Sequence, residues 1–182
     1  MNGSFKNNFY INFDNTYKVQ DYNYSFLGKI EKSKFDLPIP IKNTMIDEIS
    51  KIYLSDFQLK SIFTPKKNSI NGKGKYSFNN TEFYKIDLEN NFSKDLLNLK
   101  LNFDYVNKLK LDFINYEKLN NSIANLSLEL KKNKDNIDIS KLYYIEGDNS
   151  LKIDGLRFKK NKFLSFKKID VATLNNKFFI KY

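Results

Sequence analysis

Few side chains in this sequence could do chemistry, because the chain contains no histidine and no cysteine. These two residue types supply the commonest metal ligands, the usual general base near neutral pH, and the Ser-His and Cys-His nucleophile systems. We therefore expect no enzyme, no catalytic residue and no cofactor. The absence of cysteine also rules out a disulfide framework and leaves the redox compartment undetermined.

Carboxylates are the remaining candidates for metal binding, and Glu146 and Asp148 form the tightest pair in a turn-like stretch. Two carboxylates so close could in principle bind calcium. The spacing of an EF-hand is missing, however, and Gly, Asp and Asn are the residues that turns favour. We interpret residues 146–150 as a hairpin turn and expect no metal site.

The run Gly72-Lys73-Gly74-Lys75 is the only glycine-rich stretch that resembles a phosphate-binding loop. Such a loop needs its glycines between a buried strand and a helix, with a lysine followed by Ser or Thr. Here residues 76–78 follow with the alternation of a strand instead. The sequence therefore predicts a hairpin turn within residues 65–75, the stretch that contains this run.

Two-residue alternation is the dominant pattern of the chain. From Leu97 to Tyr105 every second residue is apolar and those between are polar, which is typical of a strand with one apolar and one solvated face. The alternation resumes over residues 109–113 and again over 126–130, and turn-forming residues separate many further short apolar runs. We predict an all-β fold: an antiparallel meander that forms a long, strongly twisted open sheet or groove.

Two stretches interrupt this pattern. Pro38 and Pro40 exclude a central strand and indicate an edge strand or a connector. Residues 44–47 have the composition of a helix start, and isoleucines follow at helical spacing. We expect at most one short helix near residues 44–54, with a strand over residues 52–59 as the alternative for its second half.

The chain of 182 residues is long enough for one domain with a substantial core. We expect residues 1–182 to form a single β-groove segment. Ten apolar residues of the alternating segments are predicted to line it: Leu97, Leu99, Leu101, Phe103, Leu109, Leu111, Phe113, Leu126, Leu128 and Leu130.

An apolar sheet face must be buried by a second sheet, by barrel closure, by helices or by a ligand. Helices are scarce in this sequence, so three possibilities remain. From the residues alone, a closed sandwich or barrel core is the simpler interpretation, and a groove that holds lipid is the other.

The net charge of +10 would attract acidic partners such as nucleic acid. Arg157 is the only arginine, however, although phosphate and base recognition favours the forked guanidinium. The lysines are spread along the polar positions and form no block. We therefore expect no nucleic-acid partner, while a basic binder with tyrosines as stacking platforms remains a distant third possibility.

Three runs carry a resemblance to a known family: residues 121–131 (NSIANLSLELK), 136–142 (NIDISKL) and 150–156 (SLKIDGL). They share an order of apolar strand, polar turn, Ile-x-Ile with a following Leu, short turn, and Leu-x-Ile-x-Gly strand. In this respect the chain, over residues 76–182, resembles the AsmA-like proteins, in particular the YhdP branch.

The resemblance implies an internal piece of a bridge-like lipid-transfer protein of the cell envelope. Such proteins are anchored in the inner membrane, cross the periplasm as a β-groove and help to move phospholipid toward the outer membrane. The expected partners are phospholipid acyl chains and adjoining β-segments of the same longer chain, with membrane contact through other parts. The segment itself has no apolar run long enough to span a bilayer, and we expect it to be soluble. The alternative is a β-sandwich structural or interaction domain whose apolar residues are ordinary core.

Overall fold

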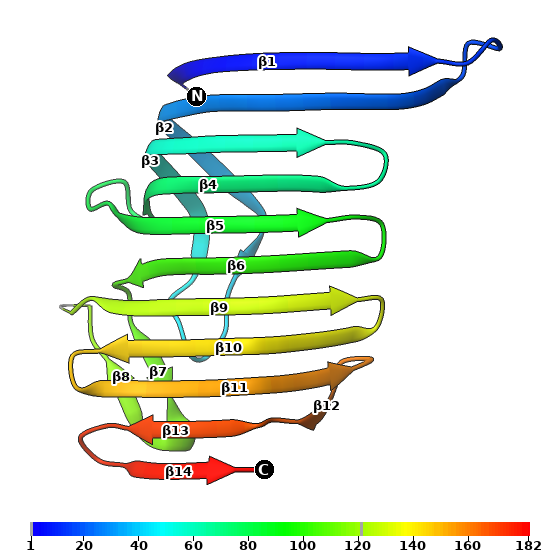
Figure 1. The fold of residues 1–182 in the computed structure, drawn as a ribbon. Helices are drawn as coiled ribbons and strands as arrows, with labels where there is room; N and C mark the ends of the chain where they lie inside the picture. The colour runs from blue at the N-terminus through cyan, green and yellow to red at the C-terminus, as the bar shows by residue number, and fades with distance from the viewer. Residues whose placement is uncertain (1, 121) are drawn as a thin grey trace.

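The computed structural model describes residues 2–120 and 122–182, and within them twelve strands form one open antiparallel sheet. Figure 1 shows the strands side by side from the N-terminal to the C-terminal edge. Along this path they are β1 (Asn2–Phe13), β2 (Val19–Ile41), β3 (Ile49–Phe63), β4 (Asn68–Ser77), β5 (Tyr84–Phe92), β6 (Leu96–Tyr105), β9 (Ala124–Asn133), β10 (Asn136–Glu146), β11 (Asn149–Lys159), β13 (Lys168–Ala172) and β14 (Lys177–Lys181). The short strand β12 (Lys162–Ser165) also pairs with β11.

The predicted all-β antiparallel meander is confirmed, and the sheet remains open rather than closing into a barrel. Figure 1 shows the strands lying side by side from β1 to β14. Asn121, the first residue of the runs that carry the family resemblance, lies outside the described residues.

Between β6 and β9 the meander is interrupted. There β7 (Leu109–Leu111), the 3-10 turn η1 (Asp112–Ile114) and β8 (Tyr116–Lys118) form a separate hairpin. Asn115 adopts a left-handed conformation with φ of 45° and closes the turn between the two strands. We call this element, residues 109–118, the cross hairpin.

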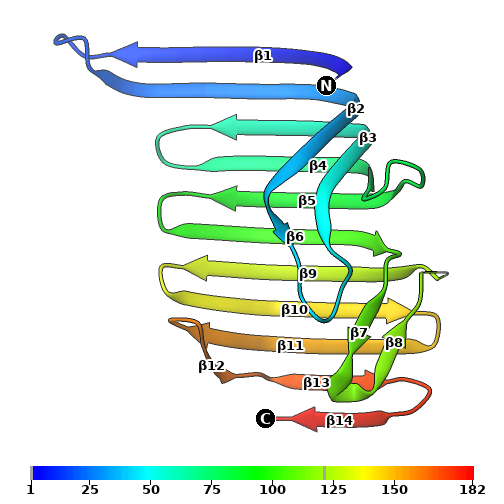
Figure 2. The same ribbon diagram turned by 180° about the vertical axis from the view of Figure 1, so that it is seen from behind.

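The hairpin of β2 and β3 is longer than its neighbours, and its far end, residues 34–52, leaves the plane of the sheet. A register shift between Ser55 and Gln58, with φ of 49° at Asp56, marks a bulge where β3 bends. We call residues 34–52 the arm. Figure 2 shows the arm and the cross hairpin lying over the same face of the sheet.

The arm and the cross hairpin are joined to each other. Ile46 and Leu109 form an antiparallel bridge, and the Lys110 amide donates a hydrogen bond to the Met45 carbonyl at 2.8 Å. Two strap-like elements from distant parts of the sequence therefore meet over one face of the sheet.

The helix that we expected near residues 44–54 does not form. Residues 42–48 connect the two strands of the arm, and the Asn43 side chain accepts hydrogen bonds from the amides of Met45 and Ile46. Strand β3 begins at Ile49, so the strand alternative for the second half is confirmed. Pro38 and Pro40 lie in the arm, where pairing with β3 is interrupted between Asp36 and Ile41, as expected of an edge.

The hairpin turn predicted within residues 65–75 is present at the start of that stretch, and it does not include Gly72 and Gly74. Both glycines lie inside β4, and the turn is made earlier, where the Thr64 amide donates to the Lys67 carbonyl at 3.2 Å. The reason is Phe57, a buried residue at the bulge of β3, which occupies the space that side chains at both glycines would need. These glycines permit a close approach between neighbouring strands and make no turn.

Candidate functional site

Seven of the ten predicted lining residues lie together on one face of β6 and β9. The register places Leu99 opposite Leu130, Leu101 opposite Leu128 and Phe103 opposite Leu126. Directly opposed residues in antiparallel strands point to the same face. We call these seven residues the apolar row: Leu97, Leu99, Leu101, Phe103, Leu126, Leu128 and Leu130.

The apolar row continues across further strands. Leu101 lies opposite Leu88 of β5, and on the other side Leu128 lies opposite Leu142 of β10, which in turn lies opposite Ile153 of β11. These continuing residues were not among the predicted lining, although their two-residue alternation was a usable signal. The apolar face therefore extends over at least five neighbouring strands.

Every member of the apolar row is half-buried. A second sheet packed on this face would bury such residues fully, as in a sandwich core. The side chains around them cover them only in part. The row is thus an apolar surface with remaining accessible area.

Leu109, Leu111 and Phe113, the other three predicted residues, do not join the row. Strand β7 pairs with β8 in the cross hairpin, while β6 pairs with β9, so these three residues leave the sheet. Leu111 is 7% exposed and lies inside a closed cluster, whereas Phe113 lies in η1 and is 65% exposed. The prediction of one continuous lining by all ten residues is therefore wrong for this segment.

The closed cluster is the main core of the structure. It consists of three residues of the cross hairpin, packed on four residues of the sheet: Leu111, Ile114 and Tyr116 with Ala124, Tyr144, Leu151 and Val171. Asn176, between β13 and β14, donates its side-chain amide to the Ile114 carbonyl at 2.6 Å. The cross hairpin is thereby fixed to the C-terminal end of the sheet.

Polar groups also hold the cross hairpin. The Tyr116 hydroxyl hydrogen-bonds the Tyr144 hydroxyl at 2.7 Å and donates to Glu146, which also accepts from Ser122. Burial, followed by the hydrogen bond to Glu146, raises the pKa of Tyr116. Glu146 ends β10 and anchors the cross hairpin, and the predicted hairpin turn is confirmed, with Gly147 and Asp148 between the paired residues Glu146 and Asn149.

Lys118, at the end of β8, is 1% exposed. Its ammonium donates to the carbonyls of Val106 at 2.6 Å and Leu119 at 2.8 Å, and it lies 5.9 Å from the centroid of the Tyr105 ring. Burial lowers the pKa of Lys118. Since the ammonium is enclosed and engaged by carbonyls, this lysine is a structural anchor.

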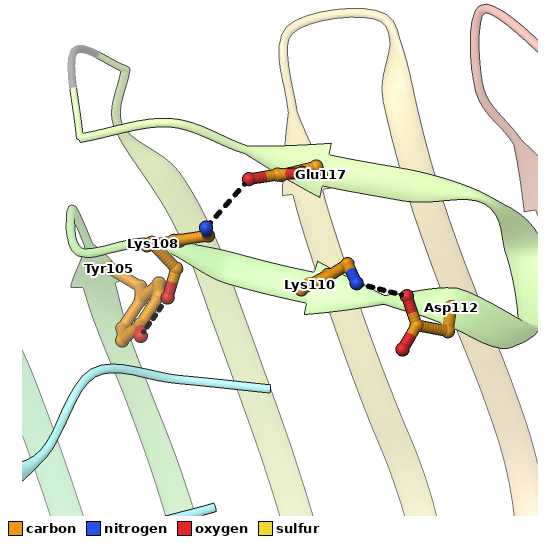
Figure 3. Close-up of polar contacts among 5 residues, drawn as sticks. All are labelled: Tyr105, Lys108, Lys110, Asp112 and Glu117. Carbon is orange, nitrogen blue, oxygen red and sulfur yellow. Dashed lines mark hydrogen bonds and ion pairs between the residues drawn. The ribbon is translucent and has the colours of Figure 1, made fainter. Parts of the chain in front are cut away.

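The outward side of the cross hairpin carries ion pairs instead (Figure 3). Lys108 lies 2.9 Å from Glu117, and Lys110 lies 2.9 Å from Asp112. The hydrogen bond to Glu117 raises the pKa of Lys108. The hairpin is thus two-faced, with apolar side chains toward the sheet and charges toward solvent.

The opposite face of the large sheet is polar. Cations and carboxylates alternate across neighbouring strands there, in the pairs Lys29–Asp56, Lys73–Asp87, Lys100–Glu89 and Arg157–Asp138. Mixed charges of this kind keep a sheet face hydrated. No group of three or more metal-ligating side chains occurs among the described residues.

The described part of the chain has no helix long and apolar enough to cross a bilayer. The chemistry that its geometry offers is apolar contact on one face and hydration on the other. No family model, curated protein or solved structure matches the chain, so its function is argued from this geometry.

Proposed function

We propose that this chain is a non-enzymatic β-segment whose apolar face holds lipid acyl chains. The observation that carries the proposal is the apolar row: seven large apolar residues, contiguous on one face of an open sheet and none of them fully buried. Covering a Leu or Phe fully contributes about 1.5–3 kcal/mol. Because the row is only half-buried, acyl chains that cover its remaining apolar surface would gain part of this free energy.

The mechanism is passive. The row presents hydrocarbon without a charged group among its seven members, so it would take acyl chains of many lipids and select no single headgroup. The charged opposite face keeps the sheet in water. In keeping with the resemblance to AsmA-like proteins, the segment would be part of an envelope protein that carries phospholipid between the inner and outer membranes.

A structural or interaction domain is the second candidate, and Leu111 favours it. This residue is packed in the closed cluster with Tyr144 and Val171, as an ordinary core residue would be. If the rest of the apolar face acts in the same way, it only supports the arm and the cross hairpin. A charged substitution in the apolar row distinguishes the two candidates: it should remove bound lipid in the first case and unfold the chain in the second.

Leu101→Lys tests the choice. A lysine at this half-buried position can extend its ammonium to water, so we expect the variant to stay folded and lose bound phospholipid. Asn102→Lys is the matched control, because Asn102 is exposed and lies on the opposite face of the same strand. Its lipid content should equal that of the wild-type protein.

The measurement is organic extraction of the purified chain followed by mass spectrometry, with a thermal melt of each variant. Phospholipid in the wild type and in Asn102→Lys, but not in a folded Leu101→Lys, supports the proposal. A wild-type chain that carries no phospholipid and takes up none from vesicles contradicts it. Unfolding of Leu101→Lys would assign the row to the core.

A further inference from the structure

Along the described residues, the strand order of the open sheet ends in β1 on one side and in β14 on the other, and these two edge strands differ greatly. β1 has twelve residues and pairs only with β2, whereas β14 has five and pairs only with β13. β14 carries Lys177 and Lys181 at its two ends, a common protection of exposed edges. β1 carries Lys6 as its single charge and has no proline.

The direction of the free backbone groups of β1 follows from its hairpin. The Asp14 amide donates to the Lys18 carbonyl at 2.9 Å, so even-numbered residues of β1 turn their backbone groups toward β2. Two later hairpins close with the same kind of hydrogen bond: the Thr64 amide donates to the Lys67 carbonyl, and the Ser93 amide donates to the Leu96 carbonyl. Odd-numbered residues of β1 therefore present free N–H and C=O groups at the edge.

We propose that β1 is the interface of a symmetric dimer, in which it pairs antiparallel with β1 of a second copy about a two-fold axis at Asn8. Odd residues then bond to odd residues, and eleven positions of each strand are paired. On the apolar face Phe5 meets Ile11, and Asn7 meets Phe9. Opposed residues keep to one face, so the apolar faces of both sheets join on the same side.

The identity of the partner follows from self-complementarity. Each chain carries a net charge of +10, so a register in which lysines do not face one another is favoured. In this register Lys6 of each copy lies opposite Tyr10 of the other, where the ammonium can contact the ring. Phe9 and Tyr10, 65% and 58% exposed in the single chain, would become covered.

This inference does not depend on lipid binding, and light scattering coupled to gel filtration tests it. The wild type should have twice the 21.6 kDa mass of one chain. Asn7→Pro removes an outward N–H and keeps the bonds to β2, so we expect a folded monomer. Asn7→Ala also removes the hydrogen bond that Asn7 accepts from the Tyr24 hydroxyl but keeps the N–H, and should remain a dimer.

Cysteine cross-linking checks the register without relying on the proline variant, and the chain has no cysteine of its own. Asn8 would face Asn8 in a non-hydrogen-bonded pair, with Cα atoms about 4.5 Å apart, which suits a disulfide. Asn8→Cys should therefore form a covalent dimer under mild oxidation, and Asn12→Cys, opposite Ser4, should not. A monomeric wild type, or equal cross-linking of both variants, would overturn the proposal.

Discussion

Phe57 of β3 packs against Gly72 of β4 so closely that any Cβ at Gly72 would overlap the phenylalanine ring. We expect Gly72→Ala to lower the free energy of unfolding by about 1–3 kcal/mol, because either the ring or the bulge beside it must move. Asn71→Ala, at the exposed neighbouring position, should change it by less than about 0.5 kcal/mol. Urea unfolding of both variants measures the difference. Equal stability of the two variants would contradict this prediction, because it would mean that the Phe57 ring can move aside at no cost.

Alanine variants of Leu111 and Leu101 should differ in stability, because Leu111 lies in the closed cluster and Leu101 lies in the apolar row. Leu111→Ala should cost about 2–5 kcal/mol, because it opens a cavity in the closed cluster around Tyr144 and Val171. Leu101→Ala should cost clearly less, since Leu101 is only half-buried. Both values come from chemical denaturation, and an equal loss at the two positions would argue that the apolar row is packed as core.

The buried tyrosines predict a loss of stability in alkali. Burial, followed by the nearby Asp47 charge, raises the pKa of Tyr105 from 10.0 to about 12. Below pH 10 both states hold the proton, but between these two values the unfolded chain loses it first. Stability should therefore fall as the pH rises through this window. Burial raises the pKa of Tyr76 and of Tyr144 in the same direction.

Tyr105→Phe isolates this contribution. The Tyr105 hydroxyl donates to the Lys108 carbonyl at 2.9 Å, so the variant should lose about 1 kcal/mol at neutral pH and decline less steeply in alkali. Burial lowers the pKa of Lys118 from its ordinary value of 10.5. The folded chain therefore loses this proton before the unfolded chain does, and this contribution raises stability as the pH rises to 10.5. Melting temperatures are therefore best compared between pH 10.5 and 12, where parallel curves would refute the assignment to Tyr105.

Nucleic-acid binding should be weak. Several cations of the polar face have carboxylate partners on neighbouring strands, as Arg157 has Asp138 at 3.4 Å, and Arg157 is the only arginine of the chain. We expect titrations with DNA and RNA at physiological salt to show only weak, salt-sensitive association without sequence preference. A nanomolar, sequence-dependent complex would contradict this prediction.

The alternation of residues 97–105 and 126–130 was sufficient to predict strands, their two faces and the members of the apolar row. A period of two is a local property, because successive side chains of any strand point to opposite faces whatever its neighbours are. The recurrence of turn residues between such runs likewise predicted the antiparallel meander.

Pairing partners depend on contacts between distant residues, and only the tertiary structure decided these. Residues 109–113 have the same alternation as the row, yet β7 pairs with β8 and carries Leu111 into the closed cluster. Gly72 and Gly74 have the composition of a turn but lie within a strand, because Phe57 of the neighbouring strand occupies the space beside them. No local pattern records a neighbouring strand, so the sequence predicted neither the exact position of the turn within residues 65–75 nor the departure of residues 109–113 from the lining.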